Sequence, residues 1–460
     1  MYKRFIGDRA FYRRTLKIAV PIIIQNGITN FVSLLDNIMV GQVGTLEMSG
    51  VSIANLLIFV FNLCIFGASA GAGIFVAQFR GRQDYQGIRY AYRYKLLVCL
   101  ILSVLAIGLF WIFDENLICM YLQGEGSPLD AAQTLFHGKA YLRIMLLGLI
   151  PFAISNTYSS TLRETGETSV PMIAGVCAVL VNLLLNYILI FGHFGAPKLG
   201  VQGAAIATVV SRFVELAIVA TWAHLHADRL IFIKGVYRTL SIPAKLFLNI
   251  TKKTLPLLIN EFLWSSGVAL INQCYSVCSL DVVPSMNIAT TMNNLASVVY
   301  MAIGHSVGII MGQMLGASKP EVQIRDTNRK LLTASVLAGV FFGALMAALS
   351  GVFPLLYNTT QSVRQLSTVL ICITAAMMPF NAHTHATYFT LRSGGQTLIT
   401  FLFDSCFLWV IRLPLAFALS HLAGLPILPL YILCNASDLI RCALGVSMLR
   451  KGTWMKNLTQ

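Results

Sequence analysis

The chain has 460 residues, of which 57% are hydrophobic and only 11% are charged. A soluble globular domain carries about 25% charged residues, so this composition leaves too little polar surface for a water-soluble monomer and excludes a soluble enzyme. Lys and Arg number 33 against 18 Asp and Glu, a net charge of +15, which would suggest a nucleic-acid partner only if the basic residues gathered on one folded face.

Long apolar runs predict membrane-spanning helices. An apolar helix of about 20 residues crosses the roughly 30 Å hydrocarbon core of a bilayer, and the sequence contains twelve such runs. Their approximate bounds are 18–40, 50–77, 96–113, 136–158, 170–191, 200–225, 254–272, 284–315, 331–353, 365–390, 397–420 and 427–449. The first run follows a basic segment and lacks a small-residue cleavage signal, so we interpret it as a retained helix rather than a signal peptide.

The positions of the basic residues predict the orientation in the membrane. Most Lys and Arg lie in the N-terminal arm, in every second connection and in the C-terminal tail, whereas the opposite connections contain only Lys139, Lys198 and Arg364. By the positive-inside rule, both termini are expected in the cytoplasm, which agrees with an even number of helices. The charge therefore indicates a multi-pass protein of a cell membrane, which we expect to be bacterial, and no nucleic-acid partner.

The two halves of the chain are similar in sequence. A shift of 235 residues aligns Pro21 with Pro256, Gly73 with Gly308, Gln78 with Gln313 and Gly81 with Gly316; a shift of 229 aligns 161–163 with 390–392. We therefore expect an all-α polytopic membrane protein with twelve transmembrane helices in two pseudo-symmetric six-helix lobes around a central cleft. The predicted N-lobe covers residues 1–230, a cytoplasmic linker 231–253 and the C-lobe 254–460. Two such lobes suit a transporter.

Small residues predict where helices pack closely. Gly67–Gly73 contains only Gly, Ala and Ser, and Gly304, Gly308 and Gly312 recur at a spacing of four. Residues four apart lie on one face of a helix, where small side chains allow neighbouring backbones to approach. We expect packing surfaces at these positions rather than phosphate-binding loops, which need a preceding strand.

Ionisable residues inside apolar runs are functional candidates because a charge at the bilayer centre costs about 2.5 kcal/mol or more. Arg212 with Glu215, and Asp438 with Arg441, are three residues apart and can form ion pairs on one helical face. Two roles remain open for Arg143 and Arg412: their side chains either reach the membrane interface or bind anionic groups. The carboxyl groups without a basic residue within one helical turn are those of Asp36, Glu261 and Asp404.

An unpaired carboxylate in the membrane can be neutralised by a proton or Na⁺, which would couple ion binding to a conformational preference. Asp36 follows Pro21 by fifteen residues, and the missing N–H of proline permits a helix bend. Asn182 and Asn186 are four apart and face one side, so their amide oxygens are suited to a hard cation. The alternative is that each asparagine makes an ordinary interhelical hydrogen bond.

These residues resemble the multidrug and toxic compound extrusion (MATE) family over nearly the whole chain. The motifs similar to the family's N-lobe are Pro21-x14-Asp36-x4-Gly41, Gln78 near the end of the second run, Asn182-x3-Asn186 and the segment from Gly195 to Thr208. Those similar to its C-lobe are Pro256-x4-Glu261 and the turn from Leu391 to Gly395. The resemblance implies an antiporter that exports organic, cationic amphipathic compounds, driven by H⁺ or Na⁺ through alternating access of two lobes.

The resemblance also implies the functional residues. The N-lobe cation site would consist of Asp36, Asn182, Asn186 and Thr208, with Asn156 nearby, and Glu261 would be the C-lobe acid. Where many members carry a further acid, this chain has Asn381, so we consider Asp404 as its replacement. No cofactor other than the coupling ion is implied, and the expected partners are small organic cations and the lipid bilayer, with the protein a monomer.

Three other functions are weighed against this one. A lipid-linked saccharide or lipid flippase of the same superfamily would need a more cationic cavity. An intramembrane enzyme would need a metal or nucleophile site, but the nearest candidates, His383 and His385, are two apart and do not share a helical face. A channel is disfavoured because separate acids in duplicated lobes suggest alternation rather than a continuous pore.

Overall fold

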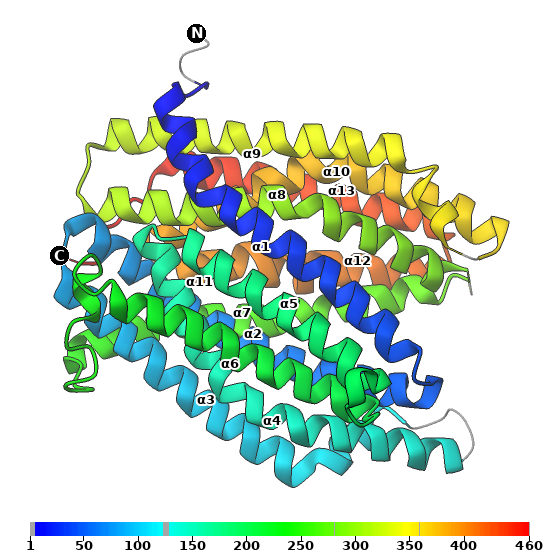
Figure 1. The fold of residues 1–460 in the computed structure, drawn as a ribbon. Helices are drawn as coiled ribbons and strands as arrows, with labels where there is room; N and C mark the ends of the chain where they lie inside the picture. The colour runs from blue at the N-terminus through cyan, green and yellow to red at the C-terminus, as the bar shows by residue number, and fades with distance from the viewer. Residues whose placement is uncertain (1–4, 123–127, 280, 358, 460) are drawn as a thin grey trace. The chain divides into compact units, whose positions relative to one another are not determined.

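The computed structural model describes residues 5–122, 128–279, 281–357 and 359–459, apart from the side chains at 33, 34, 37, 38, 45 and 128. Within these ranges the chain forms helices and turns (Figure 1), and the all-α expectation is confirmed. The first ten long helices are α1 (Arg9–Gly41), α2 (Thr45–Arg82), α3 (Tyr85–Cys119), α4 (Pro128–Thr165), α5 (Ser169–Phe191), α6 (Val201–Leu225), α7 (Ala244–Ser276), α8 (Val282–Gly316), α9 (Glu321–Leu349) and α10 (Gln361–Ser393). Short 3-10 turns, η2 (His193–Gly195), η3 (Ile231–Ile233) and η4 (Phe353–Leu356), lie in the connections.

The eleventh long helix is composite. It spans 397–422 and alternates α-turns with π-turns, in the order α11 (Thr397–Phe401), η5 (Leu402–Cys406), η6 (Leu408–Arg412), α12 (Leu413–Phe417) and η7 (Ala418–Leu422). The chain then ends with α13 (Ile427–Lys451) and a tail. π-turns are rare in proteins as a whole, but those that occur often lie at functional sites. The first two of these contain Asp404 and Arg412.

In the described part of the chain, eleven helical segments are long and apolar enough to cross a membrane. With α1 they make the twelve long helices predicted from the sequence. The predicted connections were too long, however, because α2, α3 and α4 have 38, 35 and 38 residues and continue through 78–82, 85–95 and 159–165. Hydropathy detects only the part of a helix in contact with hydrocarbon, whereas Arg, Lys and Gln sustain helical structure well beyond it.

The described chain divides into two compact units. The N-terminal unit contains 24–76 and 85–251; the C-terminal unit contains the chain up to Ile23, the segment 77–84, and the chain from Lys252 onward. α1, α2 and α7 therefore each contribute residues to both units. The domain boundaries expected from the sequence repeat, at 230 and 254, remain a prediction.

In the N-terminal unit, α4 packs against α3 and α6, and α5 packs against α6. The buried positions are rich in small residues, with Ala68, Ala72, Ala153 and Ala205 all fully buried. The run Gly67–Gly73 lies almost entirely inside, as expected for a packing surface.

The predicted linker is held tightly by α3. Arg93 donates from Nε to the carbonyl oxygen of Val236 at 2.8 Å and from Nη1 to that of Ser241 at 3.1 Å. Arg89 donates to the carbonyl oxygen of Phe232 at 3.2 Å, and the side chains of Phe232 and Val236 are buried. This segment is consequently part of the N-terminal unit rather than a free tether.

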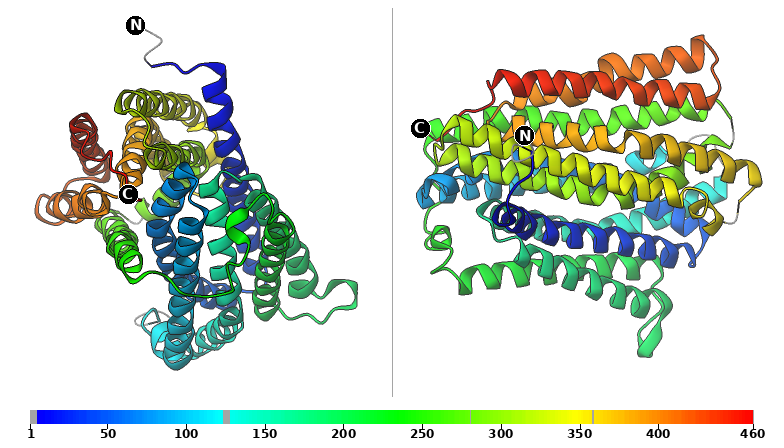
Figure 2. Two further views of the ribbon diagram at one scale, coloured as in Figure 1. Left: turned by 90° about the vertical axis from the view of Figure 1, so that its left-hand side faces the viewer. Right: turned by 90° about the horizontal axis from the view of Figure 1, so that it is seen from above.

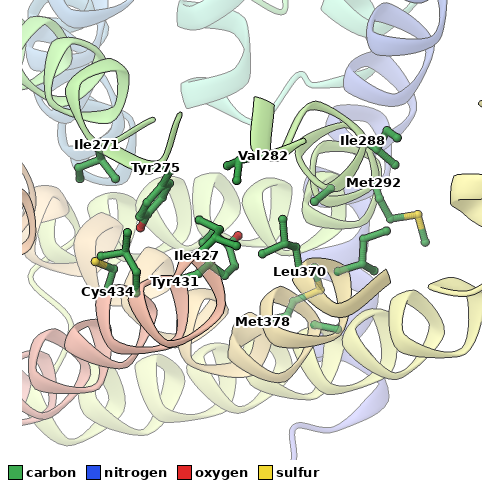
Figure 3. Packing of buried hydrophobic residues seen from close by; sticks show 14 of the residues in the cluster. Ile271, Tyr275, Val282, Ile288, Met292, Leu370, Met378, Ile427, Tyr431 and Cys434 are labelled. Atoms are coloured by element: carbon green, nitrogen blue, oxygen red, sulfur yellow. The ribbon is translucent and has the colours of Figure 1, made fainter. Parts of the chain in front are cut away.

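In the C-terminal unit, α10 packs against α8, α9 and α13, and α13 lies beside the composite helix (Figure 2). A hydrophobic cluster fills the space between α7, α8, α10 and α13, with Tyr275, Val282, Leu370, Ile427 and Cys434 among its members (Figure 3). The glycines of α8 serve close packing as predicted: a Cβ at Gly304 would lie 2.6 Å from the ring of His385, and one at Gly308 would lie 3.1 Å from the ring of Phe389.

A matched pair of glycines tests the packing of α5 on α6. A Cβ at Gly203 would lie 2.7 Å from the carbonyl group of Leu189, whereas one at Gly108 would have nothing within 4 Å. We expect Gly203→Ala to lower the melting temperature of the detergent-solubilised protein, because overpacking costs about 1–3 kcal/mol. Gly108→Ala should leave it unchanged or raise it, since alanine is the better helix former. Equal melting temperatures for the two variants would contradict this packing.

Candidate functional site

Four of the predicted site residues meet in the N-terminal unit. Asp36 comes from α1, Asn182 and Asn186 from α5, and Thr208 from α6. Asn186 donates from Nδ2 to Asp36 Oδ1 at 2.8 Å. The amide nitrogen and oxygen of Asn182 both have hydrogen-bond partners when their positions are exchanged by a half-turn of the amide group. In this orientation the nitrogen donates to Asp36 Oδ2 at 3.0 Å, and the oxygen accepts from Thr208 Oγ1 at 3.2 Å. The i, i+4 spacing on α5 places both amides on the carboxylate.

The local sequence explains why α5 and α6 can hold these side chains so close together. Gly192 ends α5 in the left-handed conformation at φ 77°, and Gly200 starts α6 at φ 55°. Both angles favour glycine. The turn between them brings the two helices into contact at Gly203, so that Thr208, less than two turns further along α6, comes level with Asn182.

The surroundings of Asp36 are polar but hold no countercharge. Asn182 and Asn186 are 6% and 2% exposed, Asp36 is half-buried, and among the described residues no basic group forms an ion pair with it. The Oδ1 atom of Asn186 is buried and lacks a hydrogen-bond partner in the described part of the chain. Carboxylate and amide oxygens are the ligands that hard cations prefer, so the group has the chemistry to bind Na⁺ or a proton.

One further residue, Tyr141, borders this group. Tyr141 of α4 interacts electrostatically with Asp36 and donates from its hydroxyl to Asn55 Oδ1 at 3.2 Å; no sequence pattern indicated this residue. Asn156, which the resemblance placed nearby, instead donates from Nδ2 to Ser69 Oγ at 2.8 Å and so joins α4 to α2.

Glu261 occupies α7 in the C-terminal unit. It is half-buried, and its electrostatic neighbours are Arg392 of α10 and Asp404. No ion pair within 4.0 Å involves Glu261 among the residues described. Its predicted character as an acid without a direct countercharge therefore agrees with the structure, while its role in coupling remains a prediction.

The expectation that Asp404 is unpaired was wrong. Arg441 Nη1 lies 3.0 Å from Asp404 Oδ1, and Asn260 donates from Nδ2 to Asp404 Oδ2 at 3.0 Å. The basic partner comes from α13, a different helix, which spacing within one helix cannot reveal. Asp404 thus shares a neutral, hydrogen-bonded environment rather than standing alone.

The pairing continues along α13. Arg441 Nε lies 3.5 Å from Asp438 Oδ1, as the spacing of three predicted, and Arg412 Nη1 makes a closer contact with Asp438 Oδ2 at 2.9 Å. We call Asp404, Arg441, Asp438 and Arg412 the ion-pair chain. Arg412, whose role the sequence left open, therefore neutralises a carboxylate.

Other charged side chains on the helices of the N-terminal unit are also paired. Arg212 lies 3.6 Å from Glu215 as predicted, and Arg143 Nε lies 2.9 Å from Asp114 Oδ2. The fully buried Lys95 lies 2.5 Å from Glu164, a pair the sequence analysis missed because both residues fall outside the apolar runs.

Asn260 was also missed, although its signal was present in the sequence. It is 1% exposed, follows Pro256 in an apolar run and directly precedes Glu261. Besides Asp404 it bonds to Ser405, whose hydroxyl donates to Asn260 Oδ1 at 2.7 Å. A buried polar side chain of this kind requires partners, and here it fixes the π-turn η5 to α7.

The histidine pair proposed for an enzyme is separated by the fold. His383 Nδ1 lies 3.4 Å from Cys442 Sγ, whereas His385 packs against Gly304 and Phe389. In the described ranges, no group of three or more His, Cys, Asp and Glu side chains is placed to hold a metal ion.

Two arginine–aspartate pairs of similar length test the ion-pair chain. Arg441→Met should destabilise the protein by about 3–5 kcal/mol, because it leaves the largely enclosed Asp404, whose side chain is 19% exposed, without a countercharge and removes one of the two basic partners of buried Asp438. Arg143→Met removes one of two basic partners of Asp114, which keeps Lys139 at 3.4 Å, and the Arg143 side chain is 49% exposed; this variant should therefore cost about 1 kcal/mol or less. Thermal unfolding in detergent measures both. The Asp404→Asn and Arg441→Met double variant should recover part of the loss; equal losses in the two single variants would contradict the assignment.

Comparison with known families agrees with this geometry. A family model described as MatE matches residues 21–188 and 256–418, one segment in each half of the chain. The protein named “Probable multidrug resistance protein NorM” from Thermotoga maritima is 25% identical over 446 residues, which cover 96% of this chain and 93% of that protein. The “Multidrug resistance protein NorM” of Vibrio cholerae is 25% identical over 414 residues, 88% and 86% of the two chains.

Solved structures show the same fold at lower sequence identity. A MOP superfamily transporter from Pyrococcus furiosus superimposes with a TM-score of 0.85 at 17% identity, covering 99% of this chain and 98% of that one. An outward-facing multidrug resistance MATE family transporter gives a TM-score of 0.84 at 17% identity, covering 98% and 97%. At this identity the likeness concerns the fold alone.

Proposed function

We propose, since the chain belongs to the MatE family of multidrug efflux transporters, that it is an antiporter which exports organic, cationic amphipathic compounds in exchange for H⁺ or Na⁺. The observation that carries the proposal is the environment of Asp36, a carboxylate held by the amides of Asn182 and Asn186 with no basic partner among the described residues. The names of the relatives support the substrate class, since they are called multidrug resistance proteins.

The coupling step uses the cost of an uncompensated charge. A carboxylate without a countercharge inside the membrane is unfavourable, and loading one cation removes that cost. Asn186 suits either ion: its unpartnered Oδ1 can ligate Na⁺, and rotation of its amide would present an oxygen to a protonated Asp36 in place of the N–H group. The loaded and empty forms of the site then favour different conformations, which is the basis of alternating access.

The energy that one coupling ion supplies depends on the charge of the cargo. A charge that falls through 100 mV releases about 2.3 kcal/mol, and about 1.4 kcal/mol corresponds to a tenfold gradient. One ion can therefore support roughly a fiftyfold gradient of a neutral compound. For a monovalent cation exchanged one for one, the process is electrically silent and only the chemical gradient of the ion contributes.

The pairing of the basic residues favours cationic cargo over the flippase alternative. Lys95, Arg412 and Arg441 each face a carboxylate within 3.0 Å. Such paired groups offer less positive charge for a pyrophosphate than free ones. Glu261 is the candidate second coupling acid, and Asp404 would take part only if Arg441 released it.

We further propose that the chain works as a monomer in a bacterial cell membrane with both termini in the cytoplasm. The excess of Lys and Arg on that side supports the orientation, and the bacterial relatives support the location.

The function is tested by transport of a fluorescent organic cation in proteoliposomes. Export should follow an imposed pH gradient or an imposed Na⁺ gradient, and the gradient that drives it identifies the coupling ion. Failure of both gradients to drive transport, with folded protein in the bilayer, would overturn the antiporter assignment.

The role of Asp36 has its own test. Asp36→Asn keeps the size and hydrogen-bonding capacity of the side chain but fixes it in a neutral form, so we expect insertion and ligand binding to persist while gradient-driven export stops. Asp228→Asn is the control, since exposed Asp228 pairs with Lys234 outside the membrane-spanning segments and this pair lowers the pKa of Asp228. Undiminished export by the Asp36 variant would refute its role.

A further inference from the structure

We propose that the C-terminal tail, residues 452–459, is a strap that holds the end of α2 against the end of α8, and that Gln78 is its anchor. On this proposal the strap must release before α2 can leave the C-terminal unit. The consequence for transport rests on the function proposed above, whereas the attachment itself does not.

The ends of α2 and α8 touch backbone to backbone. A Cβ at Gly81 would lie 1.9 Å from the carbonyl oxygen of Gln313, and one at Gly316 would lie 1.8 Å from the carbonyl oxygen of Gln78. The sequence repeat aligns Gln78 with Gln313 and Gly81 with Gly316. The glycine of each helix therefore contacts the glutamine backbone of the other helix. Such a reciprocal contact is possible only with glycine at both positions.

The turns that follow the two helices also match. Gln83 after α2 has φ 63° and Ser318 after α8 has φ 50°, and both are repeat-related positions in the left-handed region that residues other than glycine seldom adopt. The two helix ends and their turns therefore form a symmetric pair.

The tail binds this pair asymmetrically through Gln78. The Gln78 side chain is fully buried and donates from Nε2 to the carbonyl oxygens of Ser393 at 2.8 Å and Lys456 at 3.1 Å. Its Oε1 accepts from the backbone N–H of Leu458 at 2.7 Å. Gln313, the repeat-related residue, instead accepts on its side chain from Arg14 Nη2 at 3.3 Å.

Other contacts extend the tail over both helix ends. Arg82 of α2 donates to the carbonyl oxygen of Thr459. Asn457 donates to Ser318 Oγ at 3.1 Å and to the carbonyl oxygen of Gly316 at 3.5 Å. The tail therefore bridges the last turn of α2 to the last turn of α8.

A tryptophan fixes the start of the tail. Trp454 is 1% exposed and belongs to the hydrophobic cluster of α8, α10 and α13. Gly394 lies directly under its backbone, since a Cβ there would come within 1.5 Å of the Trp454 carbonyl oxygen. The start of the tail is thus anchored in the core, whereas 456–459 is held mainly by hydrogen bonds.

The position of α2 gives these contacts mechanical significance. Its residues up to Val76 belong to the N-terminal unit, while 77–84 belong to the C-terminal unit. Any rearrangement that withdraws α2 from the C-terminal unit must break the bonds of Gln78 and Arg82 to the tail. Each hydrogen bond contributes little net stability, so a short segment of this kind can open locally.

Hydrogen exchange measured by mass spectrometry tests the attachment without transport. Gln78→Ala should accelerate exchange of the amides in 456–459 and 79–84 by roughly tenfold, as expected when a few modest hydrogen bonds are lost. Gln313→Ala, the repeat-related control, should leave exchange in 456–459 unchanged. A chain shortened to end at Met455, which keeps Trp454, should accelerate exchange in 79–84 to the same extent. If neither Gln78→Ala nor the shortened chain changes exchange in 79–84, the strap is disproved.

A reversible cross-link tests the need for release. In the Arg82→Cys and Thr459→Cys double variant, a disulfide-containing bismaleimide would tie α2 to the tail, and transport of the fluorescent cation should fall at least tenfold and return on reduction. Wild-type protein, with its ten cysteines, receives the same reagent as a control. Undiminished transport after cross-linking would show that release is unnecessary and overturn the proposal. Absence of transport before cross-linking would count against the proposed function instead. In that case the hydrogen-exchange measurement would still test whether the tail is attached to α2.

Discussion

The cost of a charge in hydrocarbon determines how the interior of this protein is arranged. Most of its buried ionisable groups meet that cost with an opposite charge, as Lys95 does with Glu164 and Arg441 does with Asp404. Asp36 meets it differently, with two amide hydrogen bonds and no countercharge among the described residues. A carboxylate in this state remains able to take up a cation, and for this reason the proposed coupling is assigned there.

The sequence predicted those features that depend on one helix at a time. Apolar length gave the twelve long helices, and four-residue spacing placed Asn182 beside Asn186 and the glycines of α8 on one packing face. Helix length was underestimated because Arg89, Arg93 and Lys95 extend α3 beyond its apolar part. Hydropathy measures contact with hydrocarbon and not the reach of backbone hydrogen bonding.

Features that depend on two helices could not be predicted in this way. Asp404 was expected to be unpaired because its own helix holds no nearby base, but Arg441 approaches it from α13. Tyr141 was missed for the same reason, since its importance follows from the neighbours that the fold supplies. The family resemblance, which summarises such tertiary relations, correctly grouped Thr208 with Asp36 and the two asparagines, although Asn156 pairs elsewhere.

The composite helix records how the two copies of the ancestral unit have diverged. It has 26 residues, whereas its counterpart α5 has 23, a difference of three. The two copies nevertheless stay in one register, because a shift of 229 residues aligns Gly166 with Gly395 before the helices and Pro197 with Pro426 after them. The copies therefore differ in winding and not by inserted residues, since each π-turn closes its hydrogen bonds one residue further along the chain than an α-turn. A change in winding alters the direction in which the following side chains project, and Asp404 and Arg412 both lie in these π-turns, so the winding of this one helix determines where an acid and a base of the ion-pair chain point.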